Sequence, residues 1–119
     1  MAFVAIHIIT LILDTNMNFS LADLFIPFHV AYKPIWVGMG ILGFYFFVLI
    51  ILTSLVWVVT KYSAWRFIHY LAFPTFLALF LHGIYTGTDT STLAMTLVYW
   101  ITGMMVAIGL TYRLMMVPK

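Results

Sequence analysis

Long runs of apolar residues, separated by short polar stretches, dominate the chain. Residues 34–60 carry no charge, and a helix of that length, at about 1.5 Å per residue, exceeds the roughly 30 Å hydrocarbon core of a bilayer. Residues 64–86 carry one charge, Arg66, near their start, and residues 93–112 carry none. Each run meets the length of about 20 residues that a spanning helix needs, so the pattern predicts three transmembrane helices in these ranges.

The first apolar run is too short to cross a bilayer alone. Residues 1–13 end at Asp14 and cover about 20 Å as a helix. They lack the basic start and the small-residue cleavage site of a signal peptide, so we interpret them as the end of a longer helix. Residues 14–33 mix aromatic and aliphatic with polar residues, a pattern typical of a segment that lies in the headgroup region.

The composition supports the same class of protein. With 66% hydrophobic and 7% charged residues, the chain is predicted to be an integral membrane protein. We expect one all-α transmembrane domain over residues 1–119, a helical bundle of three full transmembrane helices plus a shortened first helix in contact with membrane lipid. At this length we expect no soluble nucleotide-binding domain beside the membrane domain, so any soluble electron donor or substrate site would belong to another chain.

The kinds of residue present limit the chemistry. The absence of cysteine excludes disulfides and iron–sulfur clusters and leaves histidine as the strong ligand for a transition metal. Five basic and three acidic residues are too few for a nucleic-acid interface.

The basic residues predict the orientation in the membrane. Because successive spans alternate in direction, one side of the membrane carries only basic residues: Lys61, Arg66, Arg113 and Lys119. The other side carries Lys33 together with the acidic residues Asp14, Asp23 and Asp89. By the positive-inside rule the side with only basic residues is cytoplasmic. We therefore expect a protein of the inner (cytoplasmic) membrane with both termini in the cytoplasm.

Histidines mark two depths within this arrangement. His69 and His82 lie thirteen residues apart, which is about 20 Å along a helix, with His82 near the outer end. His7 lies six residues before Leu13, on a segment that also ends outside, so it should reach the level of His82. Two imidazoles at one level can hold a metal, and haem iron suits them because the porphyrin supplies four nitrogens and an apolar surface. The open alternative is that each histidine hydrogen-bonds to a neighbouring helix.

Three neighbouring features have two interpretations each. On a straight helix His69 and His82 would point about 140° apart, and Pro74 could correct this by kinking the helix, or be an ordinary transmembrane proline. Arg66, one turn before His69, could pair with a haem propionate or anchor the helix at the cytoplasmic surface. Five glycines could allow a haem macrocycle to approach the helices closely, or could serve helix packing. They are Gly38, Gly40, Gly43, Gly103 and Gly109.

At these residues the sequence resembles a known family. "WRFIHYLAFPTFLALFLHG" followed by "GTD", and preceded by "IPFHVAYKPIWVGMG" and "AIHIITLILD", is similar to the ferric reductase-like transmembrane domain family. That family includes NADPH oxidases, ferric-chelate reductases and the haem membrane subunit of a bacterial methionine sulfoxide reductase. The likeness covers residues 5–89. It implies two b-type haems between two helices, with His7 and His82 as ligands of the outer haem and His69 as one ligand of the inner haem.

The chain departs from the family pattern at its start. The family's other ligand helix carries a further histidine thirteen or fourteen residues before the position of His7, which here would precede Met1. We therefore expect one complete bis-histidine site for haem b, and a second only if upstream residues exist. His29, beside Pro27 in the interfacial segment, is interpreted as a surface histidine.

Two functions remain open. The favoured one is a membrane b-type haem protein, the membrane component of an oxidoreductase, which carries electrons from a cytoplasmic flavoprotein or quinol to an extracytoplasmic acceptor. The alternative is a non-catalytic accessory subunit of a larger respiratory or photosynthetic membrane complex, whose histidines bind the magnesium of a chlorophyll or are structural.

Overall fold

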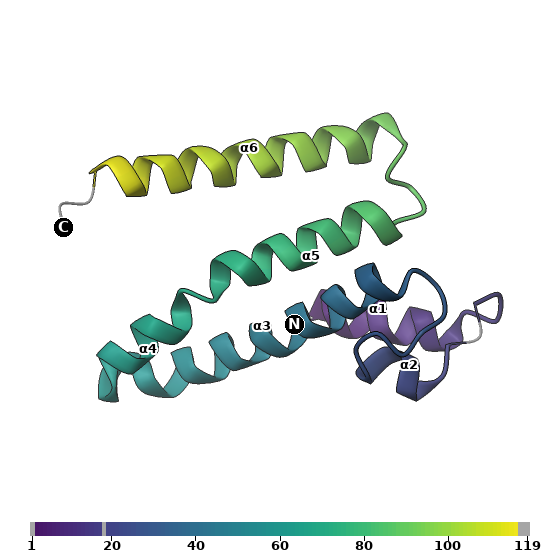
Figure 1. The fold of residues 1–119 in the computed structure, drawn as a ribbon, viewed down its shortest axis with the longest axis horizontal. Helices are drawn as coiled ribbons and strands as arrows, with labels where there is room; N and C mark the ends of the chain where they lie inside the picture. Colours follow the sequence, from purple (N-terminus) through teal and green to yellow (C-terminus); the bar gives the residue numbers. More distant parts are fainter. Residues whose placement is uncertain (1, 18, 117–119) are drawn as a thin grey trace. The chain divides into compact units, whose positions relative to one another are not determined.

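The structure is a computed structural model that describes residues 2–17 and 19–116. In these residues the chain forms helices and no strand: α1 (Ala2–Leu13), α2 (Leu21–Phe25), α3 (Pro34–Thr60), α4 (Tyr62–His69), α5 (Ala72–Thr86) and α6 (Leu93–Met116) (Figure 1). Three stretches, Pro34–Trp57, Tyr62–Thr86 and Leu93–Met116, are long and apolar enough to cross a membrane, and the apolar α1 is shorter. The predicted all-α membrane fold is therefore confirmed. Met1 and Lys119, which the predicted topology also uses, lie outside the described residues.

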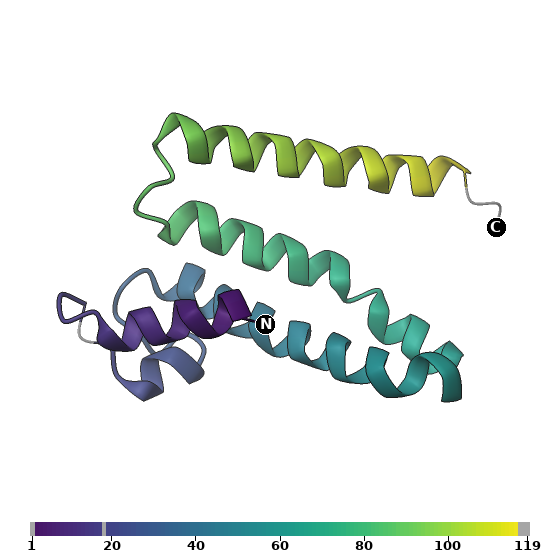
Figure 2. The same cartoon turned by 180° about the vertical axis from the view of Figure 1, so that it is seen from behind.

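The chain divides into two compact units, Met1–Thr86 and Gly87–Lys119. The second unit consists of a short loop and α6, an unbroken helix in Figures 1 and 2. Thr92 caps that helix, because its hydroxyl lies 3.4 Å from the Met95 N–H and its carbonyl accepts from the Thr96 N–H. The helix runs past its expected end at residue 112 and includes Arg113 in its last turn, where a cation is favoured by the helix dipole.

In the first unit, α3 is the central element, and its bounds match the predicted ones. Pro34 starts the helix, where a residue without an N–H loses no hydrogen bond. At the other end Lys61 alone connects α3 to α4: its N–H donates to the Trp57 carbonyl at 2.8 Å, and its carbonyl accepts from the Trp65 N–H at 2.9 Å. This sharp reversal sends α4 and α5 back along α3 (Figure 2).

One face of α3 contacts α4 and α5 in an antiparallel register. The contacts, in order along α3, are Trp36 with Tyr85, Gly40 with His82, Gly43 with Leu79 and Ser54 with Trp65. At Gly43 an added Cβ would lie 2.8 Å from Leu79 Cδ2, so the absence of a side chain permits this approach. Gly40 and Gly43 thus serve helix packing, which is one of the two roles considered for the glycines.

The helix expected over residues 64–86 begins at Tyr62 and is broken at Tyr70 and Leu71. The break lies in the turn before Pro74, which has no N–H to donate to the Tyr70 carbonyl. That carbonyl accepts instead from the Phe73 N–H at 3.3 Å, a bond that spans three residues rather than four. Pro74 therefore accompanies an interruption of the helix between His69 and His82.

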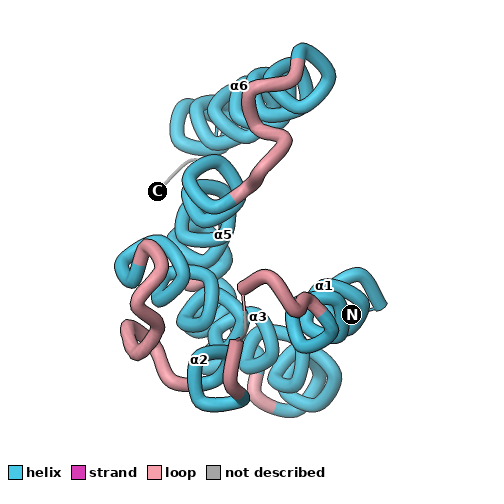
Figure 3. Tube along the Cα trace, turned by 90° about the vertical axis from the view of Figure 1, so that its right-hand side faces the viewer, coloured by secondary structure: helices cyan, strands magenta, loops and turns pink. Residues whose placement is uncertain are grey.

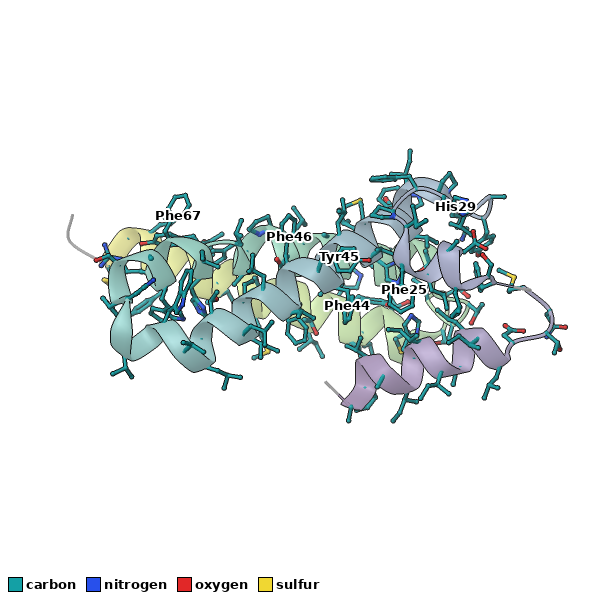
Figure 4. The ribbon with its side chains drawn as sticks, turned by 90° about the horizontal axis from the view of Figure 1, so that it is seen from below. Phe25, His29, Phe44, Tyr45, Phe46 and Phe67 are labelled. Atoms are coloured by element: carbon teal, nitrogen blue, oxygen red, sulfur yellow. The ribbon has the colours of Figure 1, made fainter. Side chains whose placement is uncertain are left out.

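The segment before α3 is mostly loop, with α2 as a single short helix (Figure 3). Ser20 and Asp23 form a capping box at the start of α2. The Tyr45 hydroxyl of α3 donates to the Phe25 carbonyl at 2.5 Å, and Figure 4 shows these two residues close together. The Phe28 ring lies against Gly38. These contacts attach the segment to the first half of α3.

The packing at Gly43 leads to the first prediction. Gly43→Val should lower the free energy of unfolding by about 1–3 kcal/mol, because the new side chain must displace Leu79 from the contact between α3 and α5. Reversible unfolding in a mixed-detergent titration measures this change. Gly109→Val is the matched control, since a Cβ at Gly109 meets no described atom within 4 Å. Equal effects of the two substitutions would contradict the packing role of Gly43.

Candidate functional site

The structure brings His7 of α1 and His82 of α5 together. Their ring centroids lie 6.2 Å apart and their planes are nearly perpendicular, at 82°. Two imidazoles on opposite sides of one metal, each with a nitrogen about 2 Å from it, have ring centres roughly 6 Å apart. The observed spacing therefore leaves room for a single metal ion between the two rings, and it is also that of an ordinary edge-to-face contact.

The ring of His82 is held from two sides by α3. Its Nδ1 lies 2.9 Å from the Trp36 carbonyl oxygen. Because a carbonyl can only accept, Nδ1 must carry the hydrogen and donate it, which leaves the lone pair of Nε2 free for a metal. The ring also lies directly on Gly40, where a Cβ would come within 2.7 Å of ring carbons. Both the tautomer and the position of the ring are thus set by α3.

The surrounding turn of α5 is held by further contacts. The Tyr85 ring stacks on Trp36 with a centroid distance of 3.8 Å, and the Tyr85 carbonyl accepts from Lys33 Nζ at 2.6 Å. The Thr86 hydroxyl donates to the His82 carbonyl at 2.6 Å. The two contacts of Tyr85 connect the end of α5 to the start of α3, and the Thr86 bond lies within α5.

His7 is less constrained. It lies on the exposed helix α1, which has no buried residue, and its carbonyl accepts from the Thr10 hydroxyl at 2.8 Å. Among the described residues, its ring contacts the ring of His82. The pair therefore combines an imidazole that α3 holds with one on an exposed helix.

His69 has a different environment. Its ring stacks on Trp65 with a centroid distance of 4.8 Å, and Trp65 Nε1 donates to the Ser54 hydroxyl at 2.9 Å. The neighbour of α4 is α3, which contains no histidine. Within residues 2–17 and 19–116 no group of three or more metal-ligating side chains occurs. Arg66, the fourth candidate, is exposed and makes no ion pair or side-chain hydrogen bond with a described residue.

His29 lies at the opposite end of the first unit from Phe67 (Figure 4). Its Nδ1 is 2.8 Å from Asp23 Oδ1, and its side chain is 53% exposed. Hydrogen bonds from the Ser20 hydroxyl, from His29 and from the Ser20 N–H lower the pKa of Asp23 from 3.8 to about 2. His29 is thus an exposed partner of Asp23, as expected of a surface histidine, and is not part of the His7–His82 pair.

The bond from His82 to α3 is what the alternative left open for the histidines expects, a hydrogen bond to a neighbouring helix, but its acceptor, the Trp36 carbonyl, was not predicted. Trp36 contributes to His82 through its backbone carbonyl, while its ring stacks on Tyr85. A partial signal was present, since Trp36, Gly40 and Gly43 follow a spacing of four and three residues and so share one face of a helix.

Comparison of the chain with protein-family models, with curated proteins and with solved structures found no match. The resemblance to ferric reductase-like membrane domains therefore stays a prediction from the residues quoted for it.

The Asp23 cluster leads to the second prediction. A carboxyl with a lowered pKa in the folded protein stabilises the fold fully above its ordinary value of 3.8 and loses this effect as the pH falls toward about 2. Ser20→Ala removes the largest cause of the shift, so the titration midpoint of Asp23 should rise toward 3.8. Carbon-13 NMR of the carboxyl carbon in detergent micelles measures this midpoint. Ser91→Ala, in the other unit, should leave it unchanged, and a midpoint that stays near 2 in Ser20→Ala would refute the assignment.

Proposed function

We propose that the chain is a membrane b-type haem protein that carries electrons across the bilayer, with His7 and His82 as the two axial ligands of one haem. The observation that supports this most directly is the 6.2 Å separation of their ring centroids. The two residues lie on different helices, and both rings are at least partly accessible. The resemblance to ferric reductase-like membrane domains points to the same ligands.

The residues around the pair fit this role. Ligating histidines usually donate their other ring N–H to a carbonyl or carboxylate, which raises ligand basicity and fixes the ring, and His82 does so to Trp36. Gly40 has no side chain and so leaves room for the His82 ring against α3. The apolar helices around the pair would exclude water. Haem b bound there would supply one-electron redox chemistry inside a membrane.

His69 would complete a second site only with a ligand from another segment or another chain, because α3 offers none at its side. Arg66 lies one turn from His69 and would meet a carboxylate there as a partner of opposite charge. The proposed donor is a separate flavoprotein or quinol on the cytoplasmic side of an inner membrane. The acceptor would lie on the side of Asp89.

The third prediction tests the haem directly. The purified chain should show the spectrum of a low-spin b-type haem, and a pyridine haemochrome assay should give one haem per chain. His82→Ala and His7→Ala should each reduce the haem content to the background level, because the remaining imidazole loses its opposite ligand. His29→Ala is the matched control and should retain the haem, since His29 bonds to Asp23 instead.

A fourth variant, Gly40→Ala, tests the site while keeping both histidines. Gly40→Ala pushes on the His82 ring and should lower haem affinity by about 10–100-fold, the range seen when partners of a metal ligand are disturbed. Chlorophyll bands or a colourless protein would refute the proposal and favour the accessory-subunit alternative. Full haem content in His82→Ala would refute the ligand assignment.

The fourth prediction tests the orientation. The chain has no cysteine, so Lys61→Cys and Asp89→Cys each introduce a single label site. In intact cells an impermeant maleimide should label position 89 and should label position 61 only after lysis, because the basic side faces the cytoplasm. Labelling of position 61 in intact cells would reverse the proposed direction of electron transfer.

A further inference from the structure

The hydroxyl of Thr75 is an unusual group in this structure. Thr75 is 3% exposed, and its Oγ1 has no hydrogen-bond partner among the described groups. A threonine in a membrane helix commonly donates to the carbonyl four residues earlier. Here the Leu71 carbonyl accepts the Thr75 N–H at 2.9 Å, and the hydroxyl does not join it.

The neighbouring helix α3 cannot supply the missing partner. Thr75, Leu79 and His82 follow the spacing of one helix face, and the last two contact Gly43 and Gly40. The same register places Thr75 opposite the turn of α3 around residue 47, where the side chains are aromatic or aliphatic. The one hydroxyl in that turn, of Tyr45, donates to the Phe25 carbonyl.

The backbone beside Thr75 is also incompletely bonded. α5 begins at Ala72, and the Phe73 N–H, which would reach the His69 carbonyl in a continuous helix, donates to Tyr70 instead. The break lies eight residues into the span Tyr62–Thr86, about 12 Å from its start, and therefore inside the hydrocarbon region. Lipid tails cannot satisfy polar groups at that depth, and irregular backbone is tolerated there where protein or water surrounds it.

We propose that Thr75 and the break between α4 and α5 bind a water molecule inside the membrane. A buried water makes two to four hydrogen bonds to groups that would otherwise be unpaired. The Thr75 hydroxyl can both donate to a water and accept from it, and the carbonyls freed at the break can accept. The site lies about 10 Å along α5 from His82. It does not depend on the proposed haem, because the groups that form it contact neither His7 nor His82.

Radiolytic labelling in water enriched in oxygen-18 tests the proposal on the full chain in lipid nanodiscs. Hydroxyl radicals formed from a bound water label the side chains next to it, while lipid-covered side chains stay unlabelled. Leu71 and Leu79, one turn before and one turn after Thr75 on the same face of the helix, should gain oxygen-18. Leu77 of α5, which is 54% exposed and so faces lipid, is the internal reference and should gain little.

Three variants complete the test. Thr75→Val keeps the shape but removes the hydroxyl and should abolish the label, whereas Thr75→Ser keeps the hydroxyl and should retain it. Thr53→Val is the matched control, because the Thr53 hydroxyl is buried but bonded to the Leu49 and Ile50 carbonyls of its own helix. Absence of label at Leu71 and Leu79 in the unaltered chain would overturn the proposal, and so would label that survives Thr75→Val.

Discussion

The close approach of α5 to α3 is the contact on which the site depends. Helices in a membrane gain little from hydrophobic association, so they pack closely where small residues let the surfaces meet. Gly40 and Gly43 provide that surface, and His82 and Leu79 fill it. The Trp36–Tyr85 stack fixes the register at one end. The depth of His82, its rotation and the direction of its Nδ1 all follow from this packing.

The break before Pro74 lets a single span follow α3 in two pieces. A straight helix would direct His69 and His82 about 140° apart, whereas α4 and α5 each pack along α3. The Trp65–Ser54 bond holds α4, and the glycine contacts hold α5. The interruption has a cost at membrane depth, because it removes backbone hydrogen bonds where lipid cannot replace them. The buried hydroxyl of Thr75 lies at this place.

Much of the fold could be predicted because bilayer thickness and apolar run length restrict it. The run at residues 34–60 indicated α3 to the residue, and counting depth put His7 and His82 at one level, where their rings meet. The acceptor for His82 could not be predicted, since the spacing of Trp36, Gly40 and Gly43 indicates a shared helix face but not the direction of a backbone carbonyl, which depends on helix rotation. The Asp23–His29 contact also escaped, because it depends on a loop in which Phe28 adopts a positive φ of 64°.

The two histidines of this span differ in how well the protein prepares them for a metal. The bond from His82 to a carbonyl selects one tautomer, which leaves Nε2 as the only nitrogen able to coordinate, and the centre of the His7 ring lies 6.2 Å from that of His82. Stacking on Trp65 fixes the plane of the His69 ring but does not select a tautomer, and no described imidazole faces it. A metal at His69 must bring or recruit its second ligand and overcome the cost of ordering it. Contacts with α3, beyond the histidines themselves, therefore prepare His82 better than His69 for the proposed haem.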